Sequence, residues 1–374
     1  MAKLGFRGRK KEDDSVYFAS QWGLIFRRFK KHKLAIVSLW ILGAFYFVAV
    51  FCEFLAPSTP EFYNSEFQYM PPQKIHWIDA EGRFHLQPFV YRIQGEMNRQ
   101  TFQRDFVEDT ARRVPVRLFA HGSPYKMWGF LRCDIHLFGP SDPKAPFYLL
   151  GSDSLGRDLF SSIVYGTRIS LSVGLIGVFL SFLIGVTVGS ISGYFGGIVD
   201  SAIQRFIELL RSFPAIPLWL TLSAALPDNM DPLLTYFAIT VILSFLHWTG
   251  LARVVRSKLL SLKNEDFVTA AKVAGQPSSM IMAKHLIPGC LSYLIVNITL
   301  AIPGMILGET SLSFLGLGLR APVVSWGVLL SEGQKASVLI LYPWLIIPVV
   351  PVIISVMAFN FLGDGLRDAA DPYK

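Results

Sequence analysis

The chain has 374 residues, of which 52% are hydrophobic and only 17% charged, and it carries 35 Lys and Arg against 27 Asp and Glu. Its uncharged apolar runs exceed the roughly 20 residues that cross a bilayer, which predicts a membrane protein and excludes a purely soluble one. The net charge of +8 is interpreted as a mark of topology and of attraction to anionic lipid, not of nucleic-acid binding, because no basic surface interleaved with aromatic residues accompanies it.

The predicted fold class is an all-α polytopic membrane protein with six transmembrane helices. The helices are expected at 34–55, 169–191, 208–227, 233–252, 288–308 and 338–362. The third is interrupted near its start by Arg211, Pro214 and Pro217, so buried neighbours or water must satisfy its backbone there.

Four parts are expected in chain order: an N-terminal segment over 1–33, the first transmembrane helix over 34–55, an insertion over 56–149 and a transmembrane core over 150–374. Basic residues gather before the first helix and in a loop of the core at 253–287: Arg27, Arg28, Lys30, Lys31, Lys33, Arg253, Arg256, Lys258, Lys263, Lys272 and Lys284. Cytoplasmic segments are enriched in Lys and Arg, so both regions, and with six helices both termini, are expected in the cytoplasm. The N-terminal stretch is not interpreted as a cleavable signal peptide, because the apolar run after its long basic region is of full transmembrane length.

The insertion over 56–149 is charged, aromatic and rich in turn signals. Two pairs of strand-like runs each flank a cluster of turn residues: 75–78 and 84–91 around 79–83, and 114–119 and 125–138 around 121–124. This pattern predicts two β-hairpins and hence a small β-containing extracytoplasmic insertion. Its favoured functional interpretation is a docking surface for a soluble partner.

Metal and disulfide chemistry are not indicated by the sequence. The four histidines of the insertion are His76, His85, His121 and His136. Their spacing matches no known ligand pattern, so they are interpreted as surface or packing residues and no metal site is expected. The three cysteines, Cys52, Cys133 and Cys290, lie far apart, so neither a disulfide framework nor a Cys-based metal site is predicted.

Small residues recur every four positions in and just after the second predicted helix: Ser181, Gly185, Gly189, Gly193 and Gly197. Such a face permits close backbone contact between helices. Packing within one subunit, centred on Gly185, Gly189 and Gly193, is favoured over a contact between subunits. Glu309, at the outer end of the fifth helix, is interpreted as an interface carboxylate beside a short re-entrant stretch at 311–317 rather than as a proton or ion site.

A short helix that the membrane does not require is predicted over 264–275. Asn264 is expected to cap its first turn, and Gly275 stands where a left-handed C-terminal cap would fall. Glu265 and Asp266 place negative charge where the helix dipole favours it. An apolar stripe of small side chains follows from helical spacing: Phe267, Ala270, Ala271 and Ala274.

A second short helix is predicted to begin at Pro277, to carry Ile281 and His285 on one side, and to run into Pro288. From these residues alone, an amphipathic connector on the membrane surface and a docking element are equally good interpretations.

The run from Glu265 to Gly275, followed by His285-Leu286-Ile287-Pro288, resembles the cytoplasmic coupling loop of ABC importer permeases. Ala270, Ala271, Gly275 and Pro288 match that pattern by their spacing. Thr269 departs from it, because many members of the family carry glutamate there. Docking of an ATPase is therefore expected to depend on shape more than on that charge.

Four further stretches resemble the dipeptide and oligopeptide permeases within that family: 150–171, 309–318, 322–327 and 358–368. The enlarged segment over 56–149 departs from their pattern. It resembles the Yej branch, whose members take up peptides and, in some cases, the peptide antibiotic microcin C.

The resemblance implies the type I ABC importer permease fold and a subunit that forms half of a translocation pathway for peptides. It also implies a homologous second permease, ABC ATPase subunits, a periplasmic peptide-binding protein and a place in the bacterial inner membrane. No cofactor is expected in this chain, since ATP and Mg would be bound by the ATPases. The residues expected to couple to the ATPase are Glu265, Asp266, Phe267, Thr269, Ala270, Ala271, Gly275 and Pro288. Residues that bind the peptide cannot be read from the apolar helices.

The chain is expected to be non-catalytic. It contains no Gly-x-x-x-x-Gly-Lys-Ser/Thr sequence, no nucleophile elbow and no His-Glu-x-x-His motif. An ion-coupled secondary transporter is one alternative, although the paired carboxylates that it would need near the bilayer midplane are not evident. A membrane-anchored receptor that reads its ligand with residues 56–149 is another, and it would leave the loop at 264–275 unexplained.

Overall fold

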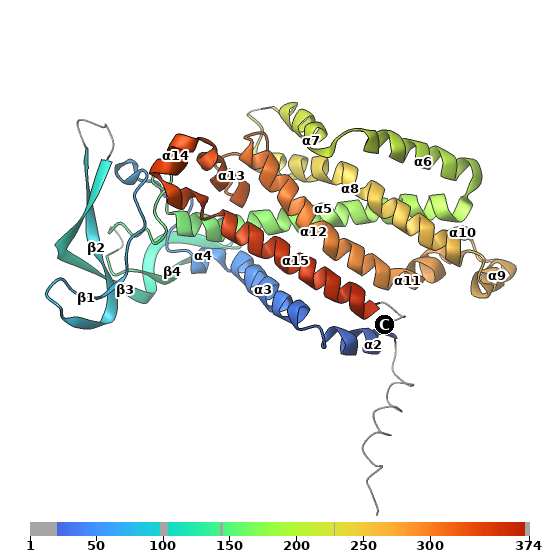
Figure 1. The fold of residues 1–374 in the computed structure, drawn as a ribbon, viewed down its shortest axis with the longest axis horizontal. Coiled ribbons are helices and arrows are strands. Elements are labelled where there is room, and N and C mark those ends of the chain that lie inside the picture. Colours follow the sequence, from blue (N-terminus) through green and yellow to red (C-terminus); the bar gives the residue numbers. More distant parts are fainter. Residues whose placement is uncertain (1–20, 98–103, 143–144, 228, 371–374) are drawn as a thin grey trace, which may run out of the picture.

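The computed structural model describes residues 21–97, 104–142, 145–227 and 229–370. These residues form an elongated bundle of helices with a β-sheet at one end and the short helices α9 and α10 at the other (Figure 1). We call the two ends the sheet end and the α9 end. Most of the segment predicted over 1–33 lies outside the described residues.

The helices account for most of the bundle. Their bounds are α2 Gln21–Phe29, α3 Lys33–Val50, α4 Cys52–Leu55, α5 Leu159–Phe195, α6 Gly197–Ser212, α7 Ala215–Ala224, α8 Pro232–Leu262, α9 Asp266–Val273, α10 Ser278–Ile281, α11 Ile287–Gly289, α12 Leu291–Phe314, α13 Trp326–Ser331, α14 Ala336–Leu341 and α15 Val349–Ala370. Within the described part of the chain, five helical segments are long and apolar enough to cross a membrane: α3, α5, α8, α12 and the stretch Pro343–Ala370 that ends with α15.

The prediction of one continuous third helix over 208–227 is wrong. The amphipathic helix α6 ends at Ser212, and the apolar helix α7 begins at Ala215 and has only 10 residues. Pro214, with ψ of 131°, separates them, because proline lacks the N–H that would continue the ladder and its ring crowds the preceding turn. In Figure 1, α6 and α7 follow one another beside α8 and together run from the α9 end toward the sheet end.

Helix α5 begins ten residues before the predicted start at 169. The side chain of Asp158 accepts hydrogen bonds from the N–H groups of Phe160 and Ser161, which caps the helix in polar surroundings. At its other end Gly196 adopts a φ of +67° and stops the helix. The resulting 37-residue helix is longer than a bilayer core is thick, so it extends beyond the apolar layer.

The segment after α4 holds an antiparallel sheet of four strands in the order β1-β2-β3-β4. The strands are β1 His76–Ile78, β2 Phe84–Met97, β3 Arg104–Met127 and β4 Leu131–Pro140. The predicted first hairpin, with its turn at 79–83, is confirmed. The predicted second turn at 121–124 is wrong, because β3 continues through it with a register shift. The hairpin turns at residues 128–130 instead.

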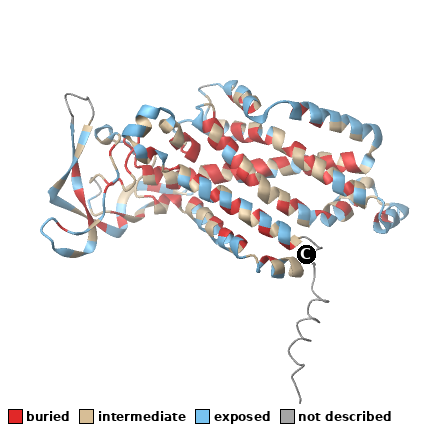
Figure 2. Ribbon diagram, in the orientation of Figure 1, coloured by how far each residue is buried: buried red, intermediate tan, exposed pale blue. Residues whose placement is uncertain are grey.

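The main apolar core lies where α5, α8, α12 and α15 meet. Buried side chains run along these helices, whereas α6, α7, α9 and the outer strands are largely exposed (Figure 2). Leu171, Leu243, Met305 and Trp326 are among its most buried members. The exposed apolar surface of the bundle is what a membrane-spanning protein presents to lipid.

Candidate functional site

The helix α9 lies at one end of the bundle. It begins at Asp266, one residue later than a cap at Asn264 would place it. Its N-cap is Glu265, whose carbonyl accepts from the N–H groups of Val268 and Thr269. The prediction that Asn264 caps the helix is therefore wrong. Asp266 occupies the first turn, where negative charge favours the helix dipole.

The predicted cap at Gly275 is confirmed. Gly275 has a φ of +75°, its N–H bonds to Lys272 O at 3.0 Å, and the N–H of Gln276 bonds to Ala271 O at 3.1 Å. This pair of bonds is the Schellman arrangement, which satisfies the last carbonyls of a helix and turns the chain sharply. The turn directs the chain into α10, so that α9 and α10 form a compact hairpin.

The predicted apolar stripe of α9 does not face one way. Val268 and Ala271 are buried against Ile281 and Leu286, whereas Phe267 is 45% exposed. The other exposed residues of the segment are Asn264, Glu265, Asp266, Thr269, Ala270, Lys272, Val273, Ala274 and Gly275. Ala271 therefore supports the hairpin from inside, and the members of the predicted stripe that remain exposed are Phe267, Ala270 and Ala274. We call these three residues the outer face of α9.

The second helix of the hairpin begins at Ser278, one residue after the predicted start, and Pro277 is its N-cap. It continues into a π-helical turn over Met282–Leu286, and Ile287 separates this turn from the exposed Pro288. Proline has no N–H to donate to the residue four positions back, so the ladder shifts to wider spacing there. His285 Nε2 lies 3.0 Å from Gln276 Oε1 and ties this turn back to the loop between the helices.

The hairpin is packed on the ends of two long helices. Val268, Ile281 and Leu286 share one apolar cluster with Val186 on α5 and with Leu259 on α8. The hairpin and these two helices therefore form one close-packed unit.

The small-residue face of α5 packs on α8 within this chain, as the favoured interpretation has it. A Cβ placed on Gly189 would lie 2.5 Å from Ala252 O, and one on Gly193 would lie 2.9 Å from Arg256 O. For Gly185 the corresponding distance to Trp248 O is 3.0 Å. Side chains at these positions would separate the two helices.

An ion pair joins α6 to α8 beside this contact. Arg256 Nε and NH2 each lie 2.5 Å from an oxygen of Asp200, which makes the pair bidentate. Ser192 Oγ on α5 donates to the same carboxylate at 2.5 Å. The helices α5, α6 and α8 thus meet at Asp200, near the C-terminal end of α8.

A buried polar network occupies the opposite half of the bundle. Glu309 is fully buried, and its carboxylate accepts from Ser313 Oγ at 2.8 Å, Ser325 Oγ at 2.6 Å and Ser170 Oγ at 3.3 Å. The interpretation of Glu309 as an interface carboxylate is wrong. The prediction of a re-entrant stretch at 311–317 is also wrong at its start, since α12 continues to Phe314.

The histidines of the insertion contact neighbouring side chains and backbone. His85 Nε2 and Arg113 NH1 lie 2.8 Å and 2.7 Å from Asp79 Oδ2. The hydrogen bond from His85, together with the N–H of Arg83 and the charge of Arg113, lowers the pKa of Asp79 from 3.8 to about 2. His136 is buried between Ala56 O and Ser123 O. Among the described residues, no group of three or more His, Cys, Asp or Glu side chains is arranged to hold a metal ion.

Two features of the site have no local signal in the sequence: the pairing of Asp200 with Arg256 and the three serines around Glu309. The first joins residues 56 positions apart, and the second joins three separate segments. A carboxylate inside an apolar run does signal partners nearby, but its spacing in the sequence does not name them.

Known proteins resemble this chain in sequence. The family model described as the binding-protein-dependent transport system inner membrane component matches residues 185–373, and a model described as the N-terminal TM domain of oligopeptide transport permease C matches residues 20–72. The dipeptide transport system permease protein DppC of Lactococcus lactis is 34% identical over 358 residues, which cover 95% of this chain and 90% of that protein. The oligopeptide transport system permease protein OppC of Haemophilus influenzae is 45% identical over 227 residues, which cover 60% of this chain and 70% of that protein. Among solved structures, the MetNI methionine ABC transporter in inward facing conformations has a TM-score of 0.43 and 20% identity, covering 56% of this chain and 97% of that chain.

Proposed function

The chain belongs to the family of binding-protein-dependent transport system inner membrane components, and we propose that it is the permease subunit of an ATP-driven importer of peptides. The observation that carries the proposal is the α9–α10 hairpin, a capped element at one end of the bundle whose outer face is left exposed. The names of the relatives, which are oligopeptide and dipeptide permeases, support peptides as the cargo. Microcin C-like peptides are a narrower proposal that rests on the enlarged insertion.

The outer face of α9 is the proposed docking site for an ATPase that binds ATP and Mg. Phe267 offers an exposed ring, and Ala270 and Ala274 allow the partner surface to approach closely. Glu265 and Asp266 add negative charge beside it. Thr269 is exposed on the same helix and adds a hydroxyl in place of a carboxylate.

Coupling of the ATPases to transport follows from a difference in their affinity for the two states of the transporter. An ATPase pair that binds the inward-facing and outward-facing states unequally shifts the balance between them, whereas equal binding would shift nothing. The apolar cluster under the hairpin would carry the shift to α5 and α8, and the Asp200–Arg256 pair would add α6 to the same moving unit.

The proposed setting is the bacterial inner membrane, with the α9 end in the cytoplasm. The basic residues of α2 and those at the C-terminal end of α8 support this orientation. The ends of α2 and α15 lie on the α9 side of the bundle, which is consistent with cytoplasmic termini (Figure 1). A second, homologous permease would complete the pathway, and a peptide-binding protein would deliver cargo at the sheet end.

The test replaces Ala270 by Asp in the assembled transporter. The substitution adds charge and bulk to the outer face of α9, so we expect peptide uptake and copurification of the ATPases to be lost while membrane insertion continues. Ala111→Asp is the matched control, since Ala111 is exposed on β3 at the sheet end. Ala271→Asp does not separate docking from folding, because Ala271 is buried in the hairpin.

Normal uptake by the Ala270→Asp variant would contradict docking at this face. Uptake driven by an ion gradient in proteoliposomes without ATP would contradict the proposed class of transporter.

A further inference from the structure

Four aromatic side chains form a continuous row from the membrane-spanning helix α3 to the tip of the β3–β4 hairpin. Between ring centroids, Phe47 lies 4.8 Å from Phe51, Phe51 lies 5.9 Å from Trp128, and Trp128 lies 6.1 Å from Phe130. We call these four residues the aromatic ladder. Phe47, Trp128 and Phe130 are 56%, 48% and 75% exposed, so the ladder is not part of a core.

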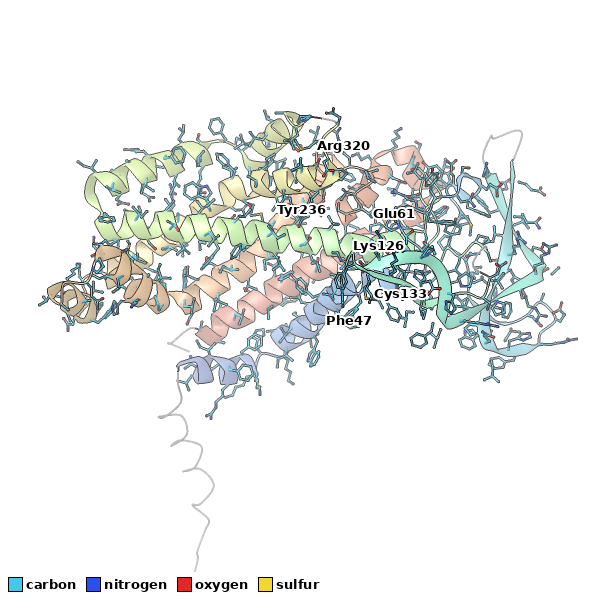
Figure 3. The ribbon with its side chains drawn as sticks, turned by 180° about the vertical axis from the view of Figure 1, so that it is seen from behind. Phe47, Glu61, Lys126, Cys133, Tyr236 and Arg320 are labelled. Atoms are coloured by element: carbon cyan, nitrogen blue, oxygen red, sulfur yellow. The ribbon has the colours of Figure 1, made fainter. Side chains whose placement is uncertain are left out.

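The tip of the hairpin is attached to the end of α3. Trp128 Nε1 donates to Val50 O at 2.9 Å, and the N–H of Trp128 donates to Glu53 Oε1 at 3.4 Å. Val50 is the last residue of α3, where the carbonyls have no partner within the helix. The indole is therefore held at the level where the membrane-spanning segment ends, which is where amphipathic indole rings are enriched in membrane proteins. In Figure 3, Phe47 and the hairpin residues Lys126 and Cys133 lie around this end of α3.

The backbone of the hairpin holds aromatic residues in conformations that aromatic residues seldom adopt. Trp128 and Gly129 have φ values of +52° and +84° and are the two central positions of a β-turn, the first of which usually carries Asn, Asp or Gly. Phe119 on β3 has a φ of +54°, is 63% exposed and lies 6.2 Å from the ring of Phe54 on α4. A bulky residue at positive φ is unfavourable unless its surroundings compensate. Transfer of these rings out of water would supply that compensation.

The charge behind the turn points to a phosphate-bearing surface. Lys126 and Arg132 are direct cross-strand partners, and both are exposed. Like charges at such positions destabilise a strand pair. Phosphate headgroups would neutralise both cations while their methylene stems cover apolar surface.

We propose that the tip of the β3–β4 hairpin is a membrane anchor, with the aromatic ladder seated among the lipids of the leaflet on the sheet side. Continuity with the surface of α3 identifies lipid as the occupant. Trp40, 77% exposed, and Phe47 lie on the helix itself, and Trp128 and Phe130 extend that surface beyond Val50. The anchor fixes the height and tilt of the sheet over the bundle, so that the β1–β2 hairpin faces away from the membrane.

The experiment places a fluorescent label at residue 130 of the full transporter in nanodiscs of phosphatidylethanolamine and phosphatidylglycerol. Phe130→Cys is made in a Cys133→Ser background, because Cys52 and Cys290 are buried. Quenching is compared between a nitroxide on the lipid acyl chain and iodide in the water. Leu86→Cys is the control, since Leu86 is 91% exposed on β2, and Leu131→Cys is a second test position that is 50% exposed.

We expect the acyl-chain nitroxide to quench the labels at 130 and 131 several-fold more than the label at 86, with the order reversed for iodide. Equal access of iodide to all three positions would overturn the anchor. Protection of positions 130 and 131 from both quenchers would also overturn it, because the ladder would then be covered by the second permease or by the binding protein.

Discussion

The hydroxyl of Ser325 donates a hydrogen bond of 2.6 Å to the carboxylate of Glu309 and so joins the start of α13 to the buried side of α12. The same hydroxyl accepts from the N–H of Val328 and thereby caps α13. Ser313 also donates to Glu309, and it accepts from the N–H of Leu319. Ser170 donates to the same carboxylate and accepts from the N–H of Trp326. One buried carboxylate thus organises the whole connection between α12 and α13.

Ser325→Ala is expected to destabilise the protein by about 2 kcal/mol, because it removes a helix cap and a hydrogen bond to a buried carboxyl group together. The measurement is the free energy of unfolding in mixed micelles, titrated with SDS. Ser311→Ala is the matched control: Ser311 lies on α12 only two residues from Glu309 but outside this network, and its substitution should change stability little. Equal effects of the two substitutions would show that the network contributes nothing beyond packing.

The contact between α5 and α8 predicts opposite effects for two Gly→Ala substitutions. Gly189→Ala should destabilise the bundle by roughly 1–3 kcal/mol, because its Cβ would lie 2.5 Å from Ala252 O and the helices would have to separate. Gly250→Ala, on α8 itself, places its Cβ in open space and should be neutral or stabilise by up to about 1 kcal/mol. Thermal unfolding midpoints of the two purified variants give the comparison. A neutral Gly189→Ala would mean that the helices are not held at this distance.

Asp200→Asn tests whether the α6–α8 ion pair belongs to the moving unit. The substitution keeps the shape but removes the charge, so we expect a loss of about 1–2 kcal/mol in stability and slower uptake at unchanged expression. Glu208→Gln is the matched control, since Glu208 pairs with Arg205 on the exposed surface of the same helix and such pairs contribute little. Unchanged uptake by Asp200→Asn would separate the ion pair from transport.

Local signals in the sequence predicted the parts of the structure that depend on neighbours in the chain. Apolar runs located α3 and α12, Gly275 located the cap of α9, and the spacing of small residues identified the face of α5 that meets α8. Each of these depends on a few adjacent residues and a fixed helical period.

Contacts between residues distant in the sequence determine the second hairpin and the buried face of α9, which the sequence did not predict correctly. His121-Gly122-Ser123-Pro124 has the composition of a turn, but β4 pairs on both sides of it and the buried His136 packs against it, so the strand continues with a bulge. On α9, Val268 and Ala271 lie in the cluster beneath the hairpin, where valine buries more apolar surface than an alanine would. Neither outcome is encoded in the local pattern.

The β1–β2 hairpin should lose stability in acid. The pKa of Asp79 is about 2 in the folded protein and near 3.8 in the unfolded chain, so the carboxylate stabilises the fold fully above pH 3.8. That contribution is lost as the pH falls from about 4 toward 2. Brief digestion with pepsin over this range should show cleavage around Phe84 and Leu86 rising as the pH falls.

Asp79→Asn should make the same hairpin susceptible already at pH 4, with little further change below it. Asp134→Asn is the control, because Asp134 pairs with His121 at an exposed site on the other hairpin. Identical pH profiles for wild type and Asp79→Asn would remove Asp79 as the cause.

Gly275→Ala should weaken coupling without touching the outer face of α9. Gly275 needs a φ of +75°, and a side chain in that region costs about 1 kcal/mol, so the Schellman turn opens and α10 loses its place beside α9. We expect peptide uptake to fall several-fold, with ATP hydrolysis by the assembled transporter no longer stimulated by loaded binding protein. Gly289→Ala, with ordinary backbone and its nearest neighbour at 3.5 Å, should retain both activities. If Gly275→Ala also retained peptide uptake and stimulated ATP hydrolysis, the rigid turn between α9 and α10 would not be needed for coupling. Docking alone would then have to account for the coupling.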